Sequence, residues 1–237
     1  MIKKHVSVII LAAGQGKRMM AKSNKQFFKI EDKPILAYTI QCFLEHAYID
    51  DIILVINQNE EEIVKNEVLN KYFKKNNFKI AYGGKERYNS VYNGLKVLDE
   101  NTDYVLIHDG ARPLVNKEEI SIVVDTLRER KACVVGVPVK NTYKLINEFK
   151  EIEYTPPREK LYSVMTPQAF HRDLIVKAYQ IGIDECAHVT DDAMMVELFT
   201  DEKVLIVDGS YENIKITIPD DILTMKRIIE GRTRYKK

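Results

Sequence analysis

Short apolar runs and amphipathic segments alternate along most of the chain. The runs are rich in β-branched and aromatic residues, which is typical of strands buried on both faces of a sheet. They occupy residues 6–13, 51–56, 78–82, 104–107 and 132–137. Segments with apolar positions at helical spacing lie between them, at residues 34–46, 60–72, 86–98 and 117–130. This alternation predicts an α/β fold with a single doubly wound, mainly parallel, Rossmann-like sheet covered by helices on both faces.

Residues 139–157 interrupt this rhythm. Two short alternating runs, 142–146 and 151–154, flank a polar NEFK turn, and Pro156-Pro157 closes the segment. This pattern predicts a β-hairpin arm, and because a lone hairpin is only marginally stable in water, the arm should pack on its own domain or on a second subunit. The pattern then predicts helices at 171–181 and 191–199, a strand at 203–207 and a helix from residue 219. With no internal repeat or linker, residues 1–237 should form one domain with a protruding arm.

Charge and cysteine content narrow the class of protein. The 36 Lys and Arg residues nearly balance the 35 Asp and Glu residues, which argues against a partner such as nucleic acid or an anionic membrane. Cys42, Cys133 and Cys186 are isolated, as expected of a protein in a reducing cytoplasm. The five His residues show no metal-binding spacing. The run 6–13 is too short to span a bilayer, and its cleavage as a signal peptide would remove a strand and a glycine loop together.

That glycine loop is the first candidate for chemistry. It follows the first strand and carries Lys17, Arg18, Lys22 and Lys25 without an acid among them. The P-loop pattern fails at Leu11 and Arg18, and the dinucleotide fingerprint fails at Met19. Gly14 and Gly16 still allow backbone N–H groups to approach a phosphate closely. A small anionic ligand therefore explains the cluster better than a solvated polar face.

Several sequence blocks in one order carry a resemblance that covers nearly the whole chain. They are LAAGQGKRM with a following KQ, GGKERYNSV at 83–91, HDGARP at 108–113, VPVKNTYK at 137–144, TPQAF at 166–170, TDDA at 190–193 and NIKIT at 213–217. This arrangement resembles the 2-C-methyl-D-erythritol 4-phosphate cytidylyltransferase family. The resemblance implies a nucleotidyltransferase fold. It also implies that CTP and the polyol phosphate are joined with release of pyrophosphate, in non-mevalonate isoprenoid synthesis.

The resemblance also implies roles for individual residues. Arg18 and Lys25 match the catalytic cations that stabilise the charged transition state, and Arg158 and Lys215 match the residues that orient the attacking phosphate, with Lys215 on a late strand. The implied nucleotide-binding residues are Leu11, Ala12, Ala13, Gly14, Gly16, Lys17, Gly83, Gly84, Ser90 and Gly110. From its local pattern alone, Ser90 is a helix-surface residue, and Arg87 is expected to brace the loop rather than to touch ligand.

A second implied group contacts the sugar phosphate, and it consists of Asp109, Arg112, Thr142, Thr166 and Thr190. Arg112 is alternatively a structural partner of Asp109 at i,i+3 spacing, and Thr142 is alternatively a residue of simple β-propensity. Thr190 is equally well explained as a helix N-cap, with Asp191 and Asp192 in the favourable first turn. Mg²⁺ is expected to bind mainly to CTP phosphates, with Asp109 as a possible contact. In the family the arm is exchanged across a homodimer, so Thr142 would serve the partner's site.

Two other functions remain open at this point. The nearest is a ribitol-5-phosphate cytidylyltransferase of the same fold, although HDGARP and VPVKNTYK are closer to the methylerythritol enzymes. The other is a non-catalytic CTP sensor, which would keep the glycine loop but would not need both Lys25 and Lys215. Pyrophosphate release with each polyol phosphate distinguishes these functions.

Overall fold

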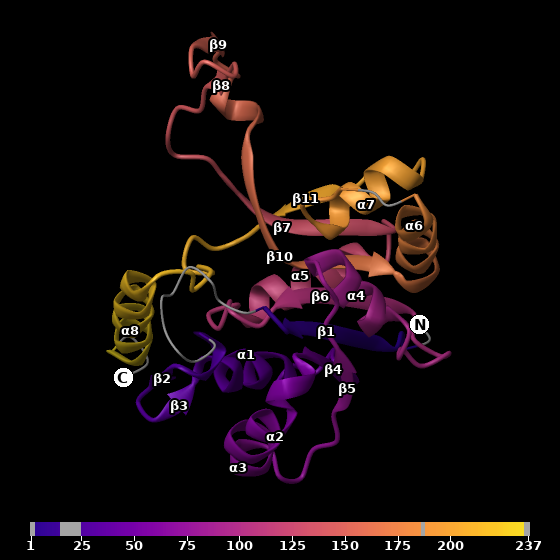
Figure 1. The fold of residues 1–237 in the computed structure, drawn as a ribbon, viewed down its shortest axis with the longest axis vertical. Helices are drawn as coiled ribbons and strands as arrows, with labels where there is room; N and C mark the ends of the chain where they lie inside the picture. The colour runs from indigo at the N-terminus through magenta and orange to yellow at the C-terminus, as the bar shows by residue number, and fades with distance from the viewer. Residues whose placement is uncertain (1–2, 15–24, 186–187, 235–237) are drawn as a thin grey trace.

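The computed structural model of the protein describes residues 3–14, 25–185 and 188–234. Within them, the main sheet has seven strands in the order β11-β7-β10-β6-β1-β4-β5. Six strands are parallel, and β10 runs antiparallel between β6 and β7 (Figure 1). The strands are β1 Val6–Ala12, β4 Asp51–Ile56, β5 Lys79–Tyr82, β6 Tyr104–Asp109, β7 Ala132–Pro138, β10 Tyr162–His171 and β11 Leu205–Asp208. The α/β class and the mainly parallel sheet predicted from the sequence are confirmed.

The strand β10 is the main element that the sequence pattern does not predict. It pairs with β6 from Gln168 to His171 and with β7 on its other side. The register on β7 shifts between Val164 and Gln168, around Pro167, which has no N–H to donate to a ladder. Because β10 is stabilised by two strands that are distant in sequence, its own residues need not show a clear alternating pattern.

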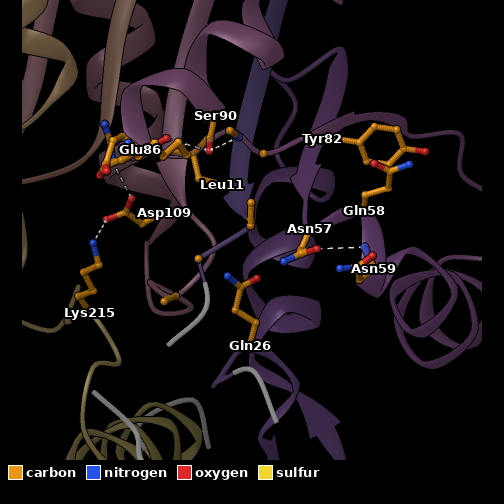
Figure 2. Close-up of a pocket in the computed structure, with 17 residues that line it drawn as sticks. Leu11, Gln26, Asn57, Gln58, Asn59, Tyr82, Glu86, Ser90, Asp109 and Lys215 are labelled. Carbon is orange, nitrogen blue, oxygen red and sulfur yellow. Dashed lines mark hydrogen bonds and ion pairs between the residues drawn. The ribbon is translucent and has the colours of Figure 1, made fainter. Parts of the chain in front are cut away.

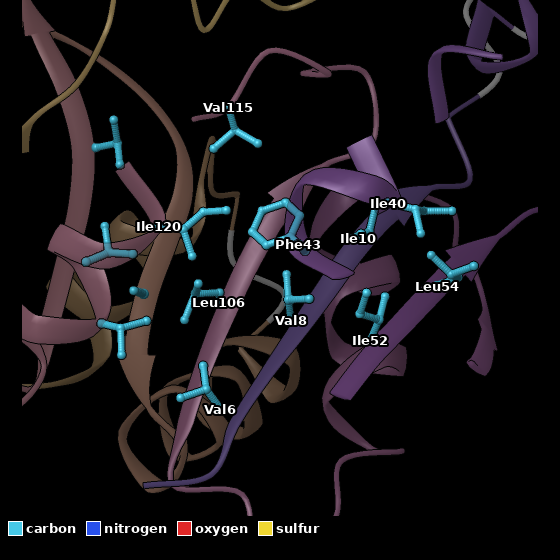
Figure 3. Close-up of a cluster of buried hydrophobic side chains, with 14 of the residues drawn as sticks. Val6, Val8, Ile10, Ile40, Phe43, Ile52, Leu54, Leu106, Val115 and Ile120 are labelled. Carbon is cyan, nitrogen blue, oxygen red and sulfur yellow. The ribbon is translucent and has the colours of Figure 1, made fainter. Parts of the chain in front are cut away.

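Two hydrophobic layers hold the helices against the sheet. On one face, Val6, Val8 and Ile10 of β1 pack with Phe43 and Ile120 from two helices (Figure 3). On the other face, the alternate residue Ile9 belongs to a separate cluster. The first face is covered by α1 Ile35–Leu44, α5 Lys117–Thr126 and the helical segment η3 Gln58–Glu60, α2 Glu61–Ile63, η4 Val64–Leu69 and α3 Asn70–Tyr72. The second is covered by α4 Arg87–Leu95, α6 Arg172–Asp184 and α7 Asp192–Phe199.

The predicted arm is present and extends well beyond the sheet (Figure 1). Its strands β8 Leu145–Ile146 and β9 Ile152–Tyr154 pair antiparallel, and the short helix η5 Arg158–Lys160 follows them. Asn147 stabilises the turn, because its Oδ1 accepts the N–H groups of Phe149 and Glu151 at 3.0 and 2.9 Å. The apolar side chains of the arm are exposed, so the hairpin has no core of its own within this chain.

A third, smaller apolar cluster positions two segments that matter for the site. The helix α8 Pro219–Arg234 contributes Met225, which packs with Ile30, Leu114 and the fully buried Ile216. The segment before Ile30 comprises η2 Lys25–Phe27 and the first strand of a small pair, β2 Lys29–Ile30 with β3 Lys33–Pro34. The backbone of Lys25 and that of Lys215 therefore lead into one common core. No helix in the described part of the chain has the length and hydrophobicity to cross a bilayer.

Candidate active site

A cleft with a volume of about 720 Å³ lies at the carboxyl ends of the parallel strands. The chain passes from β1 outward to β4 and β5 and then returns to β6 on the other side of β1. Open α/β sheets bind ligands at this kind of topological switch point. The predicted site residues that line the cleft are Leu11, Ala13, Gly14, Gly83, Gly84, Ser90, Asp109 and Lys215.

One wall of the cleft is the loop between β5 and α4. Gly83 donates its N–H to Ile56 O at 2.8 Å, and Gly84 donates its N–H to Ser90 Oγ at 3.0 Å. A side chain would not fit at either glycine, because a Cβ on Gly83 would lie 2.2 Å from that of Ala13 and one on Gly84 would lie 2.4 Å from that of Asn89. Ser90 is buried, so its interpretation as a helix-surface residue is wrong. Its hydroxyl holds the loop so that a backbone edge faces the cleft.

At the end of β6, Asp109 is surrounded by three cations. Figure 2 shows one of them, Lys215, pointing toward Asp109. Lys215 Nζ lies 2.7 Å from Asp109 Oδ2, Arg87 Nε lies 3.5 Å from Oδ1, and Arg112 Nε lies 3.7 Å from Oδ2. Burial opposes the charge of Asp109, but the positive charges of Arg87, Lys215 and Arg112 outweigh it and hold the pKa of this carboxyl well below its usual value. Asp109 is therefore a permanent anion that keeps cations at this end of the cleft.

Thr166 and His108 support Asp109 from behind. His108 Nε2 lies 3.0 Å from the Arg112 carbonyl, so it donates there, and its Nδ1 accepts the Thr166 hydroxyl at 3.0 Å. The same hydroxyl oxygen accepts the Asp109 N–H at 3.1 Å. Burial lowers the pKa of His108 to about 4, which keeps the ring neutral and this chain of hydrogen bonds intact at physiological pH.

Other predicted residues lie behind the cleft surface. Ala12 is buried, and Gly110 donates its N–H to Leu11 O at 2.9 Å. Arg112 donates to Asn213 O at 2.7 Å and is 12% exposed, so it acts as the structural partner of Asp109 that its i,i+3 spacing indicates. Arg87, in contrast, lines the cleft, and it is held by Asp192 and Asp109 rather than by the loop that it was expected to brace.

Three predicted contacts of the sugar phosphate lie away from the cleft. Thr142 is exposed on the arm, and Arg158 is exposed at its base, where its Nη1 donates to Lys140 O at 3.4 Å. Thr190 is exposed and does not cap α7, because the cap is Asp191, whose Oδ1 accepts the Met194 N–H at 2.9 Å. The interpretation of Thr190 as the N-cap is therefore wrong, because the cap is the next residue in the chain.

Lys215 lies in an extended segment outside the strands and not on a late strand, although Ile216 N–H donates to Ala111 O at 2.8 Å. Gly16, Lys17 and Arg18 lie outside the described residues. For Lys25 the structure describes the backbone, which begins η2. The catalytic roles of Arg18 and Lys25 remain predictions.

Sequence reasoning missed much of the far wall of the cleft. Asn57, Gln58 and Asn59 follow β4, and Tyr82 ends β5, across the cleft from Asp109 and Lys215 (Figure 2). The other lining residues not predicted as ligand contacts are Gln26, Lys85, Glu86, Arg87 and Ala111. The signal that would have found Asn57 and Tyr82 is positional, since both stand at carboxyl ends of parallel strands. The cleft thus has one charged end and one end lined by neutral amides.

In the described part of the chain, the residues of the cleft provide few ligand atoms for a metal ion. The group of His5, Asp51 and Asp99 has ligand atoms within 4.8 Å of one another, but it lies at the opposite, amino end of β1. Asp109 already has three cationic neighbours, so a metal ion would have to displace Lys215 to bind it closely. These donors fit a metal that is held mainly by the phosphates of a nucleotide.

Comparisons with known proteins agree with this geometry. The family model described as 2-C-methyl-D-erythritol 4-phosphate cytidylyltransferase matches residues 6–231. A protein of that name from Clostridioides difficile is 48% identical over 96% of this chain and 95% of its own length, and one from Alkaliphilus oremlandii is 45% identical over 95% of both chains.

Two solved structures are also similar to this chain. The 4-diphosphocytidyl-2C-methyl-D-erythritol synthase of Anaerococcus prevotii is 36% identical, with a TM-score of 0.86 over 96% of this chain and 97% of that one. The 2-C-methyl-D-erythritol 4-phosphate cytidylyltransferase of Francisella tularensis is 29% identical, with a TM-score of 0.80 over 94% and 99%. With a cleft at the switch point and these matches along almost its whole length, the chain belongs to the 2-C-methyl-D-erythritol 4-phosphate cytidylyltransferase family and is a nucleotidyltransferase of isoprenoid synthesis.

Proposed function

We propose that the cleft binds CTP along the Gly14 and Gly83–Gly84 loops and 2-C-methyl-D-erythritol 4-phosphate at the end formed by Asp109 and Lys215. The single observation that carries this assignment is the ion pair of Lys215 with Asp109 at 2.7 Å on the rim of the cleft. Lys215 is 36% exposed, so a phosphate can reach its ammonium group. Asp109 keeps that ammonium group in place until the substrate arrives.

The reaction needs positioning and charge more than it needs acid–base chemistry. An oxygen of the substrate phosphate forms a bond to the α-phosphorus of CTP, and the bond from that phosphorus to the bridging oxygen breaks, so that pyrophosphate leaves. Two anions have to approach each other, and fixed cations lower the cost of that approach. We assign this task to Arg18 and Lys25 at the triphosphate and to Lys215 at the attacking phosphate. Arg158 lies away from the cleft of its own chain, so its role at the attacking phosphate depends on the exchange of arms proposed below.

The neutral amide end of the cleft suits the nucleoside. Gly83 and Gly84 present backbone groups there, and Asn57 and Gln58 add side-chain donors and acceptors. Such groups recognise a base by hydrogen bonds without adding charge. Mg²⁺ would neutralise charge on the CTP phosphates, where water and phosphate oxygens complete its coordination. Asp109 would then act on the metal region from a distance rather than as a close ligand.

A homodimer formed through the arm completes the proposed site. The arm carries exposed apolar side chains that include Leu145, Phe149 and Ile152, at 56%, 75% and 63% exposure. Exposed apolar surface of this kind is stabilised when a second copy covers it. Thr142 precedes β8 on the arm and does not line the cleft of its own chain, so exchange of arms would bring it to the partner's cleft. We place the protein in the cytoplasm, since Cys42 and Cys133 are free thiols, and we treat residues 1–237 as one domain.

One assay tests the proposal. The protein is incubated with CTP and Mg²⁺, together with either 2-C-methyl-D-erythritol 4-phosphate or ribitol 5-phosphate, and pyrophosphate release is measured. We expect rapid release with the methylerythritol substrate. Release with ribitol 5-phosphate alone would assign the chain to the ribitol enzymes. Tight CTP binding without release with either polyol phosphate would make it a sensor.

A further inference from the structure

Arg87 joins two carboxylates that come from distant parts of the chain. Its two terminal nitrogens donate to the two carboxylate oxygens of Asp192, each at 2.8 Å, and its Nε faces Asp109 Oδ1 at 3.5 Å. Asp192 is fully buried and also accepts the Tyr179 hydroxyl at 2.5 Å. Partial burial works against the charge of Arg87, but Asp192 and Asp109 raise its pKa well above the usual value. A continuous line of charged contacts thus runs from α7 to the cleft.

Asp192 is in turn held at the start of α7 by Gln168 of β10. The Oε1 atom of Gln168 accepts the N–H groups of Asp192 and Ala193 at 3.0 and 2.9 Å, and its Nε2 donates to Asp191 at 2.9 Å. Gln168 and Asp191 belong to the blocks TPQAF and TDDA, and neither residue lines the cleft. Their contacts place the Asp192 carboxylate opposite the Arg87 guanidinium.

We propose that Arg87 and Asp192 are positioning residues for cytidylyl transfer, which fix the orientation of Asp109 and thereby limit its hold on Lys215. This inference rests on the proposed roles of Asp109 and Lys215. With Oδ1 turned toward Arg87, Asp109 offers its other oxygen to Lys215 and Arg112. Asp192 balances the charge of Arg87, so Asp109 is not the sole carboxylate that pairs with Arg87.

Removal of the Asp192 charge changes the pairing of Arg87 with its two carboxylates. Arg87 then has Asp109 as its remaining carboxylate partner among these residues, and the Asp109 carboxylate turns away from its present orientation. Lys215 is consequently displaced from the place where it meets the substrate phosphate. The nucleotide loop is affected less, because Gly83 and Gly84 have their own anchors on Ile56 O and Ser90 Oγ. The loss should therefore appear at the polyol phosphate and only weakly at CTP.

The first experiment compares steady-state kinetics of the wild-type protein and Asp192→Asn, which keeps the shape of the side chain. We expect kcat/KM for 2-C-methyl-D-erythritol 4-phosphate to fall about tenfold while KM for CTP changes by less than about threefold. Arg87→Lys, which keeps the charge but not the two-pronged contact, should show a smaller loss of the same kind. Val196→Ala is the matched control, because Val196 is equally buried on the apolar side of α7; it should lower Tm and leave kcat/KM unchanged.

The second experiment asks whether the effect passes through Asp109. In an Asp109→Asn background, Asp192→Asn should cause less than about a twofold further loss, whereas a purely structural role would give the same tenfold loss in both backgrounds. Additive losses, an equal rise in KM for CTP, or a wild-type kcat/KM in Asp192→Asn would overturn the inference. If Asp192→Asn does not fold, Arg87→Lys takes its place in the same cycle. A wild-type protein without turnover of the polyol phosphate would instead refute the proposed function.

Discussion

The cleft and the arm are stabilised in opposite ways, although the proposed reaction uses both. In the cleft, Asp109 is held by cations from α4, from the loop after β6 and from the segment before α8, so its charge is balanced within one chain. On the arm, the side chains of Phe149 and Ile152 are largely exposed to solvent. Charges can be matched inside a single fold, whereas apolar surface is stabilised only when something covers it. The charges of the cleft are therefore balanced within one chain, whereas the apolar side chains of the arm are covered only in the proposed homodimer.

The largest expected effect comes from removing a cation at the charged end of the cleft. Lys215→Ala should lower kcat by roughly 10²–10³-fold, because one preorganised cation at the attacking phosphate is lost. The Tm should change little, since Asp109 keeps Arg87 and Arg112 as partners. Lys131, which is exposed and paired with Glu202 at 3.1 Å, provides the control variant Lys131→Ala. A loss of less than about tenfold in pyrophosphate release would remove Lys215 from the proposed machinery.

The next prediction concerns the arm. We expect Thr142→Ala and Lys215→Ala to be strongly impaired alone, and an equimolar mixture, after unfolding and refolding together, to regain about a quarter of wild-type activity, because one cleft in each mixed dimer is complete. The mixture is assayed by pyrophosphate release.

A variant that carries both Phe149→Asp and Ile152→Lys should elute as a monomer in size-exclusion chromatography with light scattering. Complementation without any dimer, or a wild-type protein that is monomeric at assay concentration, would contradict the arm-exchange proposal.

A smaller expected effect is a dependence of stability on pH. It comes from His108, which is buried behind the cleft, and so distinguishes the cleft from the exposed arm. Burial lowers the pKa of His108 to about 4, below its unfolded value of about 6.5, so unfolding takes up a proton between these values. Stability from this group is complete above pH 6.5 and is lost as pH falls toward 4. From pH 7.5 to pH 5 the loss should be about 2 kcal/mol. Urea unfolding at each pH measures it, and His108→Gln should flatten this part of the profile.

The smallest expected effect compares one Asn in each region. Asn116 caps α5 by accepting the Glu119 N–H at 2.7 Å, so Asn116→Ala should cost about 1 kcal/mol of unfolding free energy. Asn147 holds only the turn of the arm, so Asn147→Ala should change the stability of the sheet by less than about 0.5 kcal/mol. Thermal unfolding of both variants is the measurement. Equal losses would mean that the arm folds cooperatively with the sheet.

Much of the fold and part of the cleft follow from local pattern. The runs 6–13 and 104–107 are β1 and most of β6, and their carboxyl ends bring Leu11, Gly14 and Asp109 together because parallel strands end at one edge. The strand β10 was not predictable in this way, because the strands that stabilise it come from residues distant in sequence. Asn57 and Tyr82 were missed because neutral polar residues after a strand look like ordinary loop residues.

By itself, the sequence determined the α/β class, the hairpin arm and the family, because hydrophobic periodicity and ordered motifs are properties of neighbouring residues. Only the tertiary structure decided which charges meet. Asp192 lies in the first turn of α7, as the sequence predicts, but its second role as the buried partner of Arg87 does not follow from the sequence. Lys215 reaches Asp109 across more than a hundred residues. Spacing along the chain carries no information about such pairs, since they form only when the sheet and its helices have closed around them.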